Sequence, residues 1–170
     1  MLNLIIKSIE DFRKSLDKWS SSKKGGSTST SGKQKASSAI IYVSNEYQEW
    51  QIEGLNQVQK IINEEGGVLP KDYVSKLRKT PVIEKMDKNM LKNVLSFISL
   101  KASEYKENDL AFSTCLPFDE FELFSTQSYF ISKSLGLQSV KVKHTKQDCS
   151  EIAADKLSQI IPSRPMITFV

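Results

Sequence analysis

The stretch Ala39-Ile40-Ile41-Tyr42-Val43 decides the kind of fold that this chain can form. β-branched and aromatic side chains favour extended backbone, and so short an apolar run bounded by polar residues is typical of a strand. From Trp50 onward the apolar residues recur at helical spacing, and the pattern ends at Gly66 and Gly67. The run therefore predicts a strand followed by a helix at the start of a mixed domain.

Strand and helix patterns continue to alternate towards the end of the chain. We predict further strands at 110–116, 140–143 and 166–170, and helices at 69–77, 80–105, 119–136 and 148–162. Thr80 with Pro81, Asp119 with Glu122, and Asp148 with Glu151 have the spacing of helix starts. The order β-α-α-α-β-α-β-α-β indicates an α/β or α+β fold in which helices cover a small sheet.

Two segments of different composition lie upstream of this strand. Residues 20–38 are almost wholly Ser, Thr, Gly and Lys, a composition typical of a flexible linker. Residues 1–19 carry a helical apolar stripe from Leu2 to Trp19, and this separate amphipathic helix is expected to move independently of residues 39–170. The stripe needs a partner, which is the domain that follows, a second copy, or a bundle that lies upstream.

Charge is concentrated in the linker. The chain has 24 basic and 20 acidic residues, and the four lysines between Ser20 and Ser38 account for the whole net charge of +4. The charge distribution therefore indicates a neutral folded body with a basic flexible linker. The longest apolar runs are much shorter than the roughly 20 residues of a membrane span, the start lacks the basic leader of a secretion signal, and two distant cysteines favour the reducing cytoplasm.

Local clusters of basic residues remain candidates for phosphate contacts. One lies between Lys71 and Lys79, near Tyr73, and another consists of Lys141 and Lys143 on the strand at 140–143 with Lys146 beyond it, near His144. Taken alone, such lysines are more often solubilising surface groups.

Catalytic patterns are sparse. His144 is the one histidine, and its pairing with Cys149 lacks the glycine-rich turn that surrounds a catalytic nucleophile. One histidine and two distant cysteines do not make a zinc site, and no Walker loop is present. Lys85-Met86-Asp87-Lys88-Asn89 resembles a synthetase lysine signature in three of five positions, but it lies at the start of an amphipathic helix, so we interpret it as a solvated helix face.

Several short segments resemble, in the same order, the C-terminal region of eukaryotic and archaeal-type cytosolic leucyl-tRNA synthetases. Ser8 through Trp19 resembles the last helix of the anticodon-binding bundle, and Ile41-Tyr42-Val43 resembles the opening of the C-terminal domain. Similar segments are Gly67-Val68-Leu69-Pro70, Pro117-Phe118-Asp119-Glu120, Leu135-Gly136-Leu137 and Pro162-Ser163-Arg164-Pro165. Ser163 stands where the family usually has glycine.

The resemblance implies three parts: the last bundle helix at 1–19, a basic linker at 20–38 and a tRNA-binding domain at 39–170. The family is a class I aminoacyl-tRNA ligase that uses ATP and Mg, but its catalytic domain lies outside this chain, so neither catalytic residue, metal nor cofactor is expected here. The expected partners are tRNA(Leu), especially its long variable arm, and upstream synthetase domains or another chain contacted through the Leu2–Trp19 helix. The candidate tRNA contacts are Lys71, Lys76, Arg78, Lys79, Lys141, Lys143 and Arg164.

Two other interpretations stay open at this stage. A free-standing protein-interaction module would dock through the Leu2–Trp19 helix and bind no RNA. An enzyme of another class would depend on His144 or Cys149.

Overall fold

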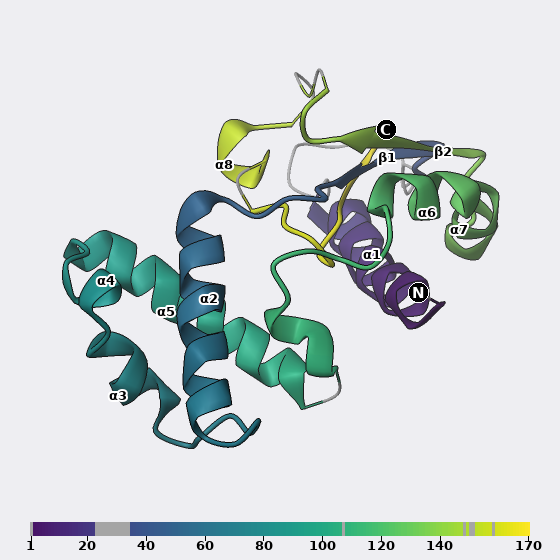
Figure 1. The fold of residues 1–170 in the computed structure, drawn as a ribbon. Coiled ribbons are helices and arrows are strands. Elements are labelled where there is room, and N and C mark those ends of the chain that lie inside the picture. Colours follow the sequence, from purple (N-terminus) through teal and green to yellow (C-terminus); the bar gives the residue numbers. More distant parts are fainter. Residues whose placement is uncertain (1, 23–34, 107, 148, 150–151, 158) are drawn as a thin grey trace. The chain divides into compact units, whose positions relative to one another are not determined.

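The computed structural model describes residues 2–22, 35–106, 108–147, 149, 152–157 and 159–170 (Figure 1). The chain divides into two compact units, one formed by Met1–Asn45 with Leu116–Val170 and the other by Glu46–Cys115. We call them unit 1 and unit 2. The division differs from the predicted ranges of 1–19 and 39–170, because the helices after the first strand form a body of their own.

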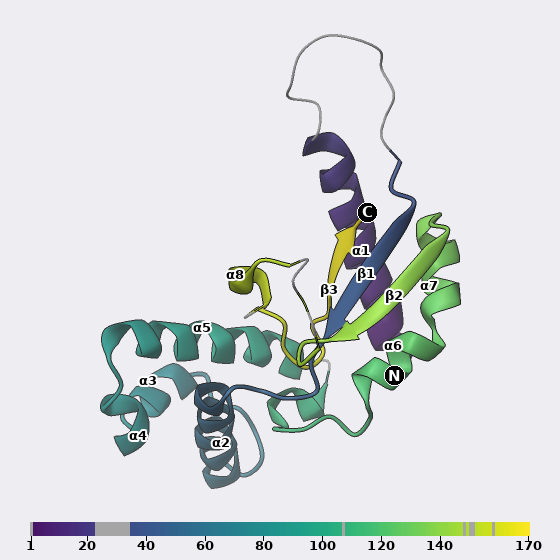
Figure 2. The same ribbon diagram turned by 90° about the horizontal axis from the view of Figure 1, so that it is seen from above.

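Unit 1 is built on a three-stranded sheet. Its strands are β1 (Ser38–Val43), β2 (Ser139–His144) and β3 (Met166–Phe169), in the order β2-β1-β3. β1 pairs parallel with β2 and antiparallel with β3, and Figure 2 shows it between the other two. The stretch Ala39–Val43 therefore lies in the central strand, and the small predicted sheet is confirmed.

Helices α1 (Leu2–Ser22), α6 (Glu120–Thr126) and α7 (Ser128–Leu135) lie against one face of this sheet (Figure 1). Alternate residues of β1, Ala39, Ile41 and Val43, point into the core that these helices cover. Tyr42 points to the opposite face, where it packs with Ile152 and Ile160 around α8 (Ala154–Leu157). Three helices therefore cover one face of the small sheet, and the segment around the short α8 packs on the other.

Helix α1 docks onto the sheet of the same chain. Ile5, Ile9 and Phe12 are at most 5% exposed, and the Phe12 ring lies 6.5 Å from that of Phe124. Arg13 also donates a hydrogen bond of 3.3 Å to the carbonyl oxygen of Ser134. The partner of the apolar stripe is therefore the domain that follows, the first of the partners considered from the sequence. This packing differs from the expectation that the helix moves independently.

The linker boundaries also differ from the expected 20–38. Residues 20–22 belong to α1, and Ala36 is buried in the core of unit 1. Ser37 and Ser38 donate backbone hydrogen bonds to the carbonyl oxygen of Val170. The central part of the linker, residues 23–34, lies outside the described residues, as does the predicted pair Asp148 and Glu151.

Unit 2 is helical within its described residues. Its helices are α2 (Glu49–Glu64), α3 (Tyr73–Arg78), α4 (Pro81–Glu84), α5 (Lys88–Tyr105) and the 3-10 helix η1 (Asp109–Phe112). Gly54 lets α2 approach α5, because a Cβ at that position would lie 3.2 Å from Val94 and 3.3 Å from Ile98. Tyr47 and Trp50 pack edge-on against Phe97 and extend the core along α5.

Four predicted elements are wrong in detail. Within the described residues, the helix predicted at 148–162 is only the short α8 (Ala154–Leu157). The expected strand at 110–116 is not formed, because the Asn108 side chain accepts a hydrogen bond from the Leu110 N–H and starts η1, which buries Phe112 against Tyr105. The single helix predicted at 80–105 is two helices, because Asp87 caps a new start. The helix at 119–136 is likewise divided at Gln127 into α6 and α7.

Candidate nucleic-acid interface

The predicted basic residues of unit 2 lie on α3 or beside its ends. Lys71, Arg78 and Lys79 are exposed. Lys76 differs, since its ammonium group donates a hydrogen bond to Glu65 and lies 3.9 Å from Asp72. The bond to Glu65 raises the pKa of Lys76 above its ordinary value. The charge of Lys76 is therefore already partly balanced within the protein.

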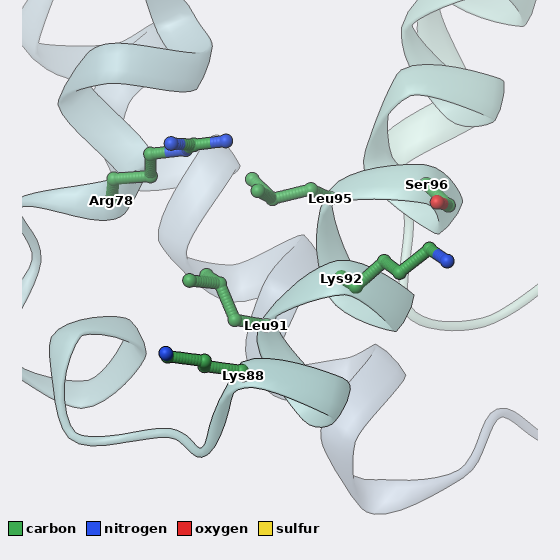
Figure 3. A pocket seen from close by; sticks show the side chains of 6 residues that line it. All are labelled: Arg78, Lys88, Leu91, Lys92, Leu95 and Ser96. Carbon is green, nitrogen blue, oxygen red and sulfur yellow. The ribbon is translucent and has the colours of Figure 1, made fainter.

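Arg78 lies at one side of a shallow groove of about 380 Å³ whose other side is helix α5. The groove is lined by Arg78, Lys88, Leu91, Lys92, Leu95 and Ser96 (Figure 3). Leu91 and Leu95 are half-buried, while the three basic residues are exposed. No acidic side chain is found among the described residues that line it. The groove thus combines a positive rim with an apolar floor.

The sequence of α5 explains this arrangement. Lys88, Leu91, Lys92 and Leu95 follow one another at steps of three and four, so they share one helix face. The adjoining side of the helix carries the buried Val94 and Ile98.

The helix begins at Lys88 because the carboxylate of Asp87 accepts hydrogen bonds from the backbone N–H groups of Asn89 and Met90, at 2.8 and 3.0 Å. The start of α5 at Lys88 sets the position of its basic face relative to Arg78.

Sequence reasoning missed Lys88, which it assigned to a solvated helix face, and it did not select Lys92 as a candidate. The signal was present in the alternation of lysine and leucine at 88, 91, 92 and 95. The lysine–leucine face of α5 forms a groove only because Arg78 of α3 lies opposite it. The closeness of Arg78 to this face depends on the fold and is not visible in the sequence.

The other three predicted residues belong to unit 1. Lys141 and Lys143 alternate with Val140 and Val142, which face the core under α1, and they lie beside Ile40 and Tyr42 on the opposite face. Lys141 is exposed and Lys143 is half-buried. The seven predicted residues therefore fall into two sets, one in each unit.

Arg164 is exposed in the turn before β3. The preceding Ser163 has a left-handed φ of 68°, and its backbone N–H donates a hydrogen bond to the buried carboxylate of Glu120. The backbone N–H of Arg164 donates to the carbonyl oxygen of Ile161 at 2.9 Å. The turn that presents Arg164 is therefore fixed from both sides.

The hypothetical Cys-His pair does not have the geometry of a nucleophile and its base. Nδ1 of His144 accepts a hydrogen bond from the backbone N–H of Lys146 at 3.1 Å. The Cys149 thiol contacts the backbone carbonyl oxygen of His144, with Sγ at 3.7 Å. Both groups organise the turn that follows β2. Within the described residues, no group of His, Cys, Asp and Glu is placed to hold a metal ion.

Among the described helices, none has the length and apolar character that would let it cross a bilayer. The described residues thus combine a mixed α/β fold with a groove that three basic residues line. The sequence of the chain is 30% identical over 171 aligned positions to "Leucine--tRNA ligase, cytoplasmic" of Dictyostelium discoideum. The alignment covers 99% of this chain and 16% of that relative, and no protein-family model matches. The chain is therefore related to a part of leucyl-tRNA synthetases, and it spans about one sixth of the length of that curated relative.

Proposed function

We propose that this chain is the C-terminal part of a cytoplasmic leucyl-tRNA synthetase and that it contributes binding and orientation of tRNA(Leu), through the long variable arm, to leucylation. The observation that carries the proposal is the alignment with the ligase, which extends over 99% of the chain. The catalytic work, with its ATP and Mg, is assigned to parts of the synthetase outside this chain.

The charges of unit 2 support a contact with RNA. Arg78, Lys88 and Lys92 line one groove, and no ion pair joins them to a carboxylate in the part of the chain that the structure describes. Cations that replace condensed counterions on phosphates gain affinity from the release of those ions. A second contact made by a linked module also benefits from a raised effective concentration, so a weak patch is sufficient.

Binding of the full chain to transcribed leucine tRNA, with and without its variable arm, tests the proposal. We expect the arm to increase affinity. For about three phosphate contacts, affinity should fall by about 20- to 40-fold between 50 and 200 mM salt. The proposal is overturned if the chain binds neither RNA at low salt, or if removal of the arm leaves the affinity unchanged.

A matched pair of charge variants examines which cations make the contact. Arg78→Gln should weaken binding and lower the slope of log affinity against log salt by about one. Lys76→Gln should have a clearly smaller effect, because Glu65 already holds the Lys76 ammonium group. Fluorescence anisotropy with labelled tRNA measures both variants, and equal losses would contradict the assignment of the contact to the groove side of α3.

A further inference from the structure

The groove between Arg78 and α5 has a property that phosphate binding alone does not require. Its rim is cationic, but its floor is made by Leu91 and Leu95, both half-buried. A ribose–phosphate backbone would use the rim and leave the apolar floor in contact with water. A ligand that satisfies the whole groove therefore carries a negative charge and a flat apolar surface side by side.

We propose that this groove binds an unpaired nucleotide of the RNA, with the base on Leu91 and Leu95 and the adjoining phosphate at Arg78 and Lys88. This inference rests on the proposed function and names the part of the RNA that unit 2 recognises. Nucleotides join an anionic group to a flat ring, which is the combination that the groove requires.

The directions of the side chains favour this assignment. In Figure 3, Leu91, Leu95 and Lys88 extend from α5 towards the side where Arg78 lies, and the Arg78 guanidinium extends towards Leu95. Lys92 extends the other way. One cation from each wall thus converges on the leucine floor, while Lys92 adds charge at the outer edge.

The size of the groove favours an unpaired base over a duplex. Ligand pockets typically measure about 300–1,000 Å³, so about 380 Å³ is suited to a group the size of one nucleotide. In an A-form duplex the base faces are stacked inside the helix, and a protein reaches mainly phosphates and 2′-hydroxyls. An unpaired base exposes its face, and an arginine plane can stack on it as well.

The test compares two RNA probes with the same number of phosphates, a single-stranded oligoribonucleotide and a fully paired duplex. We expect the full chain to prefer the single strand. The double variant Leu91→Gln and Leu95→Gln keeps the charge and removes the apolar floor, so affinity for the single strand should fall about fivefold or more while duplex binding changes little. Arg78→Gln should also reduce the preference. Lys92→Gln is the matched charge control, and it should weaken binding to both probes equally.

The outcomes separate this inference from the proposed function. If tRNA binds with arm dependence but the leucine variant and Arg78→Gln affect both probes equally, the groove contacts only phosphates and the inference is overturned. If the chain binds no RNA, but binds a glutamate-rich peptide in a way that Arg78→Gln abolishes, the groove accepts an acidic protein segment and both proposals fail. Arg78 and Lys92 are exposed, so their variants keep the test valid if the leucine variant does not fold. Thermal unfolding establishes which variants are folded.

Discussion

Replacement of Phe12 by alanine tests whether α1 is part of the core of unit 1. Phe12 is 3% exposed and packs against Phe124, so the substitution removes a large buried side chain and leaves a cavity. Such changes cost about 3–5 kcal/mol. That is a large part of the roughly 5–15 kcal/mol that stabilises a typical domain. Ile6, on the same helix but 47% exposed, is the matched control, and Ile6→Ala should cost less than about 1 kcal/mol.

The two tryptophans allow each unit to be followed separately. Trp19 lies in unit 1, with its ring 6.1 Å from that of Phe169, and Trp50 lies in unit 2 against Phe97. With Trp50→Phe in the background, Trp19 fluorescence reports the unfolding of unit 1 in urea. At a slope of about 2 kcal/mol per molar urea, Phe12→Ala should lower the midpoint by about 1.5–2.5 M.

The reciprocal background, Trp19→Phe, reports unit 2, whose midpoint should not move because the packing partners of Phe12 belong to unit 1. Refutation would be a midpoint shift for Phe12→Ala no larger than that for Ile6→Ala. In that case α1 would not be docked in solution, and its stripe would be available to another partner.

Two further stability predictions follow from backbone geometry and capping. Ser163→Gly should raise the free energy of unfolding by about 0.5–1 kcal/mol, because a left-handed φ strains any residue with a Cβ by about 1–2 kcal/mol and the greater freedom of unfolded glycine removes part of the gain. Gly136→Ser, also at φ 68° with no atom within 4 Å of the added Cβ, should give the opposite sign in the same thermal unfolding measurement. Asp119→Ala should cost about 1 kcal/mol near neutral pH, because Asp119 caps α6 by accepting a hydrogen bond from the N–H of Glu122 at 3.0 Å. That bond holds the pKa of Asp119 below its usual value, so its stabilisation is complete above the ordinary carboxyl pKa and is lost as pH falls through the lower folded-state value. Urea unfolding near pH 7 and at about pH 3 should therefore show a smaller difference between wild type and variant in acid.

Much of the fold could be predicted because its signals are local. The strand at 38–43 is encoded by its own side chains, and the ends of α2 and α7 are encoded by Gly66, Gly67 and Gly136, all at positive φ. The strand at 110–116 was wrong because alternation in a short run does not separate a strand from a tight turn. There the side chain of Asn108 decides, by accepting the Leu110 N–H.

The packing of α1 shows a different limit. The stripe from Leu2 to Trp19 predicts that a face must be buried but carries no information about its partner. The partner is fixed by residues far along the chain, such as Phe124 and Phe169.

The candidate site could be predicted only in part. Charge alone identified Arg78 and Lys79, but it also identified Lys76, whose acidic partner Glu65 lies eleven positions away in sequence. The groove depends on the meeting of α3 with α5, so Lys88 became a candidate only when the fold was known.

The insertion of unit 2 between β1 and the rest of unit 1 affects the order in which the chain can acquire structure. Unit 2 is continuous from Glu46 to Cys115, whereas β1 must wait for β2 and then for β3, the last strand of the sheet. Closing loops of this length is slow, because the entropy cost is met before the strand contacts form. During synthesis on the ribosome the helical unit can therefore fold while Ala39–Val43 is still an apolar segment whose backbone has no strand partner. A chaperone that binds extended hydrophobic segments would find its target there until Phe169 has left the exit tunnel.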